Sequence, residues 1–230
     1  MLSFKRRHFT REIILTAIRW YIAYSLSYRN IEEMLCERGI TADHSTINRW
    51  VIKYAPLLEG IFRKKYKRPT GLSWHMDETY LLNKGKWCYL YRAVDKEGHT
   101  VDFMLSAKRD CKTALKFFLK TLGNNRIPHT VNIDKSGAND AALKMLNLFL
   151  FFKSLYRHLI KIRQNKYLNN IVEQDHRAIK RLVKPMLGFK SFVTAKATIA
   201  GIELHHMLKK GQMLNSESMT VWEQFYALAG

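Results

Sequence analysis

From residue 72 onward, the chain alternates strand-like and helix-like segments in an order that few folds accommodate. Three segments rich in aromatic and branched residues, LSWHMDETYLL, KWCYLYRAVD and HTVDFMLSA, are separated by the turn-like sequences NKGK and KEG. They predict three consecutive antiparallel strands. A helix over residues 110–122, a short strand over 130–134, another helix, a basic strand over 160–163 and a helix over 168–184 are then expected.

This order of strands and helices is that of an RNase H-like domain, so we expect an α/β fold with a mixed five-stranded sheet and flanking helices. The N-terminal part has helical periodicity, and Gly39 breaks the pattern between two short helices, which is typical of an all-α helix-turn-helix domain. The predicted domains are a helix-turn-helix domain at 1–60, a basic linker at 61–71, an RNase H-like catalytic domain at 72–190 and a C-terminal helical segment at 191–230.

The third N-terminal helix, capped by Asp43 or Ser45 and expected to end near Tyr54, has two distinct faces. Its apolar face should pack inward and consists of Ile47, Trp50, Val51 and Tyr54. Its candidates for DNA contact are Ser45, Thr46, Asn48, Arg49 and Lys53. Asparagine suits adenine, arginine suits guanine, and serine and lysine suit the backbone. The alternative is an ordinary helical bundle with a polar outer face.

The charge of the chain favours a polyanionic partner. Lys and Arg number 39 against 19 Asp and Glu, for a net charge of +20, and the middle third is the least basic. A passive nucleic-acid-binding protein or an anionic-membrane binder would share this composition. The longest apolar run, residues 148–152, is too short to span a bilayer. The three cysteines lack metal or disulfide spacing, so we expect a reducing cytoplasm.

Three carboxylates are the candidates for a metal site. Asp77 lies within the first predicted strand, Asp134 closes the fourth, and Glu173 lies in the first turns of the helix that follows the fifth. Parallel pairing of the first and fourth strands would bring the two aspartates together, and the helix would place Glu173 above them. Such a cluster would bind Mg²⁺, with Mn²⁺ as a substitute, for phosphoryl transfer. Glu78 and Asp175 are rivals for the first and third positions.

Two cations follow Glu173 on the same predicted helix face, Arg177 at i+4 and Lys180 at i+7. They would hold a DNA phosphate beside the metal ions, although a plain Glu–Arg helix pair is the alternative. His176 and the pair His205–His206 have no third partner at metal-ligand spacing and are expected to be structural.

Several of these segments resemble the IS6 family of insertion-sequence transposases. The similarity lies in WHMDETY, YLYRAVD, IDKSGAN, KYLNNIVEQDHRAIK and MLGFKSF, and in the N-terminal YRNIEEMLCERGI and STINRWV, and it covers nearly the whole chain. The resemblance implies an RNase H-like DDE domain behind a helix-turn-helix domain. It also implies binding to terminal inverted repeats and Mg²⁺-dependent strand transfer, typically giving replicative cointegrates. By this resemblance Asp77, Asp134 and Glu173 are the three acids, and Lys180 is the basic residue that follows them.

One departure from the family concerns the distance between the second and third acids. Thirty-eight residues separate Asp134 from Glu173, four more than is usual in the family, and the surplus falls around the apolar sequence LNLFLFFKSLYRHLI. This segment is either a tolerated extension or a lesion in a decaying copy of the element. The second case would leave a catalytically inactive, sequence-specific DNA-binding protein.

The expected partner is double-stranded DNA, both as inverted-repeat ends and as target. Because transposition joins two ends, we expect a homodimer or a larger assembly on DNA and no membrane association. A stand-alone RNase H-type nuclease is less consistent with the N-terminal helix-turn-helix, since that module adds specificity for duplex DNA.

Overall fold

The computed structural model describes residues 4, 8–135, 137–165 and 170–230, which form two compact units. One unit comprises residues Met1–Arg68 with Ile179–Gly230, and the other comprises Pro69–Ala178. The domain boundaries expected at residues 60, 71 and 190 stay predictions. Residues 168 and 169, where the last helix of the catalytic domain was expected to begin, lie outside the described residues. No helix in the described ranges is long and apolar enough to cross a membrane.

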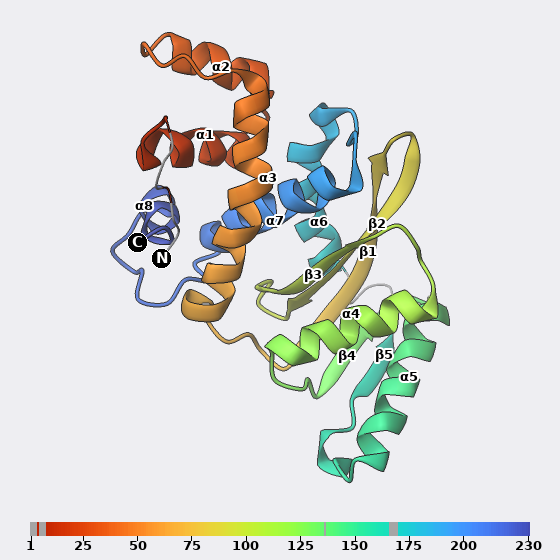
Figure 1. Cartoon of the computed structure of the whole chain (residues 1–230). Helices are drawn as coiled ribbons and strands as arrows, with labels where there is room; N and C mark the ends of the chain where they lie inside the picture. Colours follow the sequence, from red (N-terminus) through yellow and green to blue (C-terminus); the bar gives the residue numbers. More distant parts are fainter. Residues whose placement is uncertain (1–3, 5–7, 136, 166–169) are drawn as a thin grey trace. The chain divides into compact units, whose positions relative to one another are not determined.

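The Pro69–Ala178 unit is built on a five-stranded sheet of order β3-β2-β1-β4-β5 (Figure 1). Its strands are β1 (Ser73–Asn83), β2 (Lys86–Asp95), β3 (Thr100–Ser106), β4 (Thr130–Ile133) and β5 (Lys161–Gln164). The first three pair antiparallel, whereas β4 pairs parallel to β1 and β5 pairs parallel to β4. This strand order and these directions confirm the predicted RNase H-like sheet and the predicted pairing of the first and fourth strands.

Three helices accompany the sheet: α4 (Cys111–Asn124), α5 (Gly137–Phe152) and α6 (Asn170–Val183), with a 3₁₀ turn at Tyr156–His158. The apolar core lies between one face of the sheet and the helices α4 and α5. It contains Trp74 and Met76 of β1, Phe117 of α4 and Leu146 of α5. Successive strand residues face opposite sides, so Asp77 faces away from this core.

Local signals account for the ends of these elements. Asp110 caps α4 by accepting a hydrogen bond from the backbone N–H of Thr113 at 2.8 Å. Lys84 and Gly85, the two central residues of the hairpin between β1 and β2, both have positive φ, at 50° and 71°. That conformation matches the right-handed twist of the two strands and explains the glycine in NKGK.

The other unit is helical and combines both ends of the chain. It contains α1 (Arg11–Ala23), α2 (Tyr28–Cys36), α3 (His44–Ile61), α7 (Phe192–Lys209) and α8 (Val221–Ala227). Helix α7 contacts α1, α3 and α8, and most of its residues are buried. At Gly201 a Cβ atom would lie 2.7 Å from Ile22 and 3.0 Å from Ala55, so the absence of a side chain permits this close helix packing.

The end of α3 differs from the expectation. The helix was expected to stop near Tyr54, but it continues through Pro56 to Ile61 and then into a π-helical turn, Phe62–Tyr66. Ala55, Leu58 and Phe62 are fully buried on this extension. Their burial offsets the backbone hydrogen bond that a proline removes from a helix interior.

Candidate active site and DNA-binding surface

Of the two aspartates of the proposed metal site, Asp77 lies in β1 and Asp134 directly follows the end of β4. In the parallel pair of β1 and β4, His75 is opposite Asn132, and Asp77 and Asp134 each follow two residues later. Their side chains are partly accessible, with exposed fractions of 20% for Asp77 and 37% for Asp134. Both carboxylates therefore open toward solvent at the same edge of the two strands.

Helix α6 lies on the face of the sheet to which Asp77 points. Nε2 of His176 is 3.3 Å from Oδ2 of Asp77, close enough for an ion pair but without the alignment of a hydrogen bond. Arg92, which is opposite Asp77 in the β1–β2 register, donates a hydrogen bond to Asp175 at 2.7 Å. Two consecutive residues of α6, Asp175 and His176, therefore lie against this face.

Glu173 lies in the first turn of α6 and is exposed, as are Arg177 and Lys180. It precedes His176 by three residues and therefore shares its side of the helix. Within the described residues, Asp77, Asp134 and Glu173 do not bring their ligand atoms within 4.8 Å of one another. The structure brings the two aspartates together and directs α6 toward them, and it leaves Glu173 at the solvent side.

The rival carboxylates have partners of their own. Asp175 is bound to Arg92, whose side chain is fully buried. Glu78 is buried and lies 3.4 Å from the guanidinium of Arg109, which is also 3.9 Å from Asp134. Burial raises the pKa of Glu78, and Arg109 opposes this effect. Arg109 was not among the residues expected at the site; its position just before the Asp110 cap of α4 was the only local signal.

A separate group of possible ligands, Asp95, Glu97 and His99, has its atoms within 4.8 Å of one another. The buried Asp95 carboxylate accepts hydrogen bonds from the backbone N–H groups of Gly71, Glu97 and His99 at 2.8–3.1 Å. These bonds close the turn between β2 and β3. The Asp95 carboxylate is therefore explained by its role in holding the backbone here.

In the helical unit, α3 has the two faces that the sequence predicts. Ile47, Val51 and Tyr54 are buried, whereas Arg49 is exposed. Asp43 is the N-cap: it accepts hydrogen bonds from the backbone N–H groups of Ser45 and Thr46 and from both hydroxyls. These bonds lower the pKa of Asp43. The two hydroxyls are therefore occupied by the cap in this structure, and Thr46 also accepts a hydrogen bond from Arg49 at 2.7 Å.

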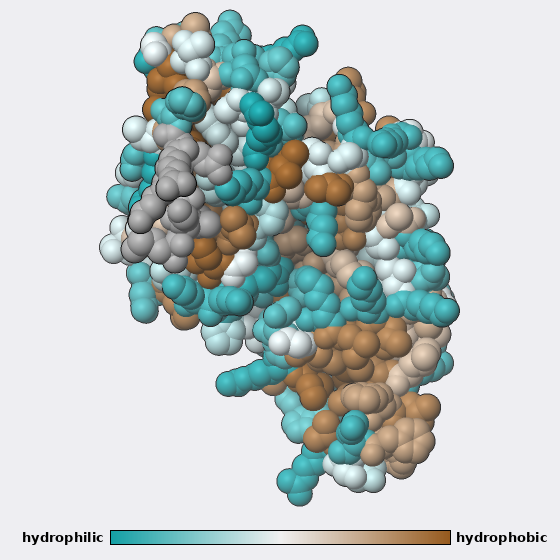
Figure 2. Space-filling model, in the orientation of Figure 1, coloured by the Kyte–Doolittle hydropathy of each residue, from teal (hydrophilic) through white to brown (hydrophobic). Residues whose placement is uncertain are grey.

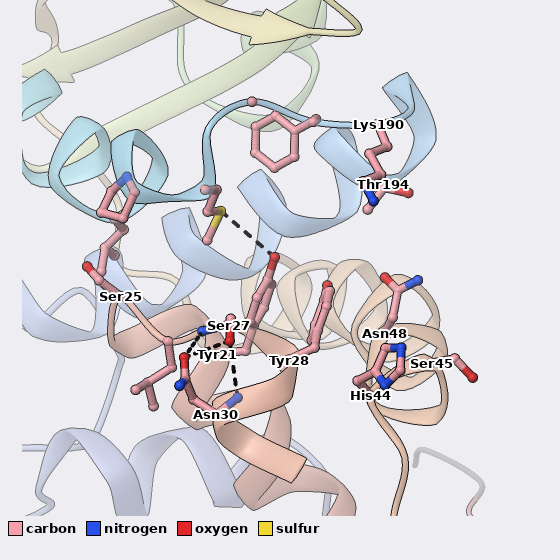
Figure 3. Close-up of a pocket in the computed structure, with 16 residues that line it drawn as sticks. Tyr21, Ser25, Ser27, Tyr28, Asn30, His44, Ser45, Asn48, Lys190 and Thr194 are labelled. Atoms are coloured by element: carbon pink, nitrogen blue, oxygen red, sulfur yellow. Dashed lines mark hydrogen bonds between the residues drawn. The ribbon is translucent and has the colours of Figure 1, made fainter. Parts of the chain in front are cut away.

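Asn48 and Ser45 line a cavity of about 630 Å³ inside the helical unit (Figure 3). Tyr21 and Tyr28 form one part of its wall, stacked with their ring centroids 4.1 Å apart. The segment that links α6 to α7 and the start of α7 form the opposite part, where Lys190 and Thr194 lie across from α3. Lys190 is exposed, so the polar end of α3 and this cation border the same opening. Lys190 was also absent from the expected DNA-binding residues.

Comparison with known proteins identifies the family. A DDE-domain family model of IS240-type transposases matches residues 71–212. The chain is 40% identical over 211 residues to the transposase of the insertion sequence-like element IS431mec of Staphylococcus aureus, covering 91% of this chain and 90% of the relative. This chain belongs to the IS6 family of DDE transposases. A second relative, the transposase of insertion sequence element IS257 in transposon Tn4003 of S. aureus, has the same identity and coverage. The transposase is accordingly a polynucleotidyl transferase of insertion-sequence elements.

Two solved structures resemble the transposase at lower similarity. The HTLV-2 integrase catalytic core domain in complex with magnesium aligns with a TM-score of 0.43 and 20% identity, over 69% of this chain and 99% of that one. The simian T-cell lymphotropic virus intasome in complex with PP2A regulatory subunit B56 gamma aligns with a TM-score of 0.44 and 14% identity, over 91% and 74%. The fold assignment rests on the strand order described above.

Proposed function

We propose that this transposase binds the terminal inverted repeats of its element and catalyses metal-dependent DNA cleavage and strand transfer, giving replicative cointegrates. The observation that carries this proposal is the placement of Asp77 in β1 and of Asp134 directly after β4, with the Arg92–Asp175 pair and His176 of α6 on the Asp77 face. The family supports the reaction class, and the geometry supports these residues as its centre.

The donor chemistry fits Mg²⁺, with Mn²⁺ as a substitute. Carboxylate oxygens are the ligands that these cations prefer, and the two aspartates are accessible, one within β1 and the other directly after β4. Asp77, Asp134 and Glu173 would hold the ions. When bound, such ions supply charge stabilisation for the attacking and leaving oxygens of the phosphoryl group. Arg177 and Lys180 would position the DNA phosphate through their exposed cations.

End recognition is assigned to α3. Ser45, Thr46, Asn48, Arg49 and Lys53 are the proposed DNA contacts, with Asn48 and Arg49 as the base readers. Lys190 extends this surface, because it borders the same opening as Asn48 and Ser45. The net charge of +20 suits phosphate binding over a broad surface. The active form would be a dimer or larger assembly that acts on the DNA of a bacterial nucleoid.

One observation favours a second candidate, a DNA-binding protein that has lost catalysis. Glu173 does not complete a close group of three ligands with the aspartates, and the segment between Asp134 and Glu173 is longer than is usual in the family. A protein with a displaced Glu173 would still bind inverted repeats through α3.

One experiment separates the two candidates. The protein is incubated with a labelled inverted-repeat end carrying a free 3′-OH, a plasmid target and either Mg²⁺ or Mn²⁺, and joined products are measured. Joining by the wild type that Asp77→Asn abolishes supports the transposase. End binding without nicking or joining in either cation rejects catalysis and supports the DNA-binding protein.

A further inference from the structure

The second half of α5 and the turn after it expose an unusual amount of apolar surface. Eight large apolar side chains there have exposed fractions between 38% and 75%. We call this surface the α5 apolar patch; it consists of Met145, Leu148, Phe149, Phe151, Phe152, Leu155, Tyr156 and Leu159. Figure 2 shows apolar colouring gathered where Figure 1 places α4 and α5. The site described above uses none of these residues.

The patch is organised as a helix-packing surface. Met145, Leu148, Phe149 and Phe152 follow one another at i, i+3, i+4 and i+7 and form one stripe along the outer side of α5. The opposite side of the helix buries its own apolar residues against the core, including Leu143, Leu146 and Leu150. Helix α5 is therefore apolar on both sides, which is the pattern of a helix buried between two layers.

Ring contacts extend the stripe beyond the end of the helix. The ring of Phe151 lies 6.0 Å from that of Phe152 and 5.0 Å from that of Tyr156, both edge to face. These contacts join the helix and the turn at Tyr156–His158 into one continuous surface. Three exposed basic residues neighbour these side chains in the sequence, namely Lys144, Lys153 and Arg157, and Lys144 forms an ion pair with Asp140 at 2.6 Å.

The size of the patch matches one side of a stable protein interface. Apolar side chains of this kind have full areas of about 150–250 Å² each, so the exposed fractions sum to roughly 800 Å². The largest apolar patch of a typical monomer is about 300–600 Å², and a standard interface buries about 800 Å² per partner. The area thus exceeds what a monomer usually exposes and equals what a dimer needs.

We propose that the α5 apolar patch binds the same patch of a second copy of this chain, so that two α5 helices pack across a two-fold axis. A two-fold contact requires only one self-complementary surface, and the eight side chains of this patch carry no charge that would select a different partner. The proposal does not depend on the DNA chemistry proposed above.

The salt dependence of dimerisation distinguishes this interface from association through DNA. Lys153 and Arg157 of each copy would lie beside the apolar contact, so added salt should screen the repulsion between the two copies and strengthen the dimer. Association through DNA would weaken in salt, because phosphate contacts are screened. Raising NaCl from 0.1 M to 0.5 M on nucleic-acid-free protein should therefore tighten dimerisation.

The test is the mass of the full chain in solution, measured by light scattering and sedimentation at increasing concentration. Wild type should reach a plateau at twice 27.1 kDa. Leu148→Lys combined with Phe152→Lys should weaken dimerisation about a hundredfold, because two added cations meet their copies across the axis. The matched control, Leu57→Lys combined with Trp222→Lys, adds the same charge at exposed apolar positions outside the patch and should leave the dimer intact.

Folding of the variants is checked by circular dichroism and melting temperature. Leu148→Gln with Phe152→Gln, a neutral pair, provides a second route should the lysines unfold the helix. Hydrogen exchange in residues 145–159 should slow as wild type dimerises. A monomeric wild type at tens of micromolar, a patch variant that dimerises like wild type, or particles that grow without a plateau would each overturn the proposal.

Discussion

Asp175 accepts a hydrogen bond from the buried guanidinium of Arg92 at 2.7 Å, and this pair ties α6 to β2 two residues after Glu173. Breaking one partner leaves the other charge buried and uncompensated. Arg92→Met or Asp175→Leu alone should lower the free energy of unfolding by about 3 kcal/mol or more, measured by urea denaturation. The double variant should lose much less unfolding free energy than the sum of the losses of the two single variants.

The same double variant also tests the role of Asp175. If Asp175 only holds α6 in place, a folded Arg92→Met, Asp175→Leu protein keeps measurable strand transfer. Complete loss of joining in a double variant of near wild-type stability would instead make Asp175 a ligand. If the unfolding free energy lost by the double variant equals the sum of the two single losses, Arg92 and Asp175 do not form a stabilising pair.

Replacing a proposed ligand should separate chemistry from binding. Asp77→Asn, Asp134→Asn and Glu173→Gln should each reduce strand transfer by roughly a thousandfold, since several kcal/mol of transition-state stabilisation is lost. Affinity for an inverted-repeat end should stay within a few-fold of wild type, because α3 is unchanged. Wild-type joining by any one of the three variants would remove that residue from the site. Trp87→Ala, an exposed change outside the site, is the control.

The assignment of base reading to α3 predicts a loss of specificity. Arg49→Ala or Asn48→Ala should weaken binding to the inverted repeat by about 1–3 kcal/mol and change binding to unrelated DNA much less. Lys53→Ala should weaken binding to both DNAs alike and make affinity less salt-dependent, as expected for a phosphate contact. Competition titrations at two salt concentrations measure both effects. Equal losses on both DNAs for Arg49→Ala would exclude base reading by that residue.

The buried His205 of α7 predicts an acid-sensitive stability. Burial, with the neighbouring basic residues Lys209, Arg19 and His206, lowers the pKa of His205 from 6.5 to about 4. The unfolded chain then binds the extra proton between those values, so stability is full above pH 6.5 and falls as the pH drops toward 4. The loss should be on the order of 3 kcal/mol. His205→Leu should flatten this part of the pH profile of the unfolding free energy.

The control for that profile is His129→Leu, which replaces an exposed histidine. It should leave the dependence between pH 4 and 6.5 unchanged. A His205→Leu profile that still follows wild type would assign the acid sensitivity to other groups.

Local chemistry was sufficient for much of the fold. The alternation of apolar and polar residues in WHMDETY, the NKGK turn and the Asp43 cap each act over a few residues, so the strands, the hairpin and the start of α3 could be predicted. Even the neighbouring positions of Asp77 and Asp134 followed from the strand order. The end of α3 could not be predicted from the sequence, because the burial of Leu58 and Phe62 against the rest of the unit overrides the local effect of Pro56.

The sequence by itself determined the order of strands and helices, the family, and which acids are candidates, because these depend on periodicity and short motifs. Only the tertiary structure decided which candidate acids contact another side chain of the protein. Asp175 has Arg92 as its partner and Asp77 has His176 beside it, contacts between residues 83 and 99 positions apart. Pairing over such distances depends on how the sheet and α6 meet, and no local pattern carries that information.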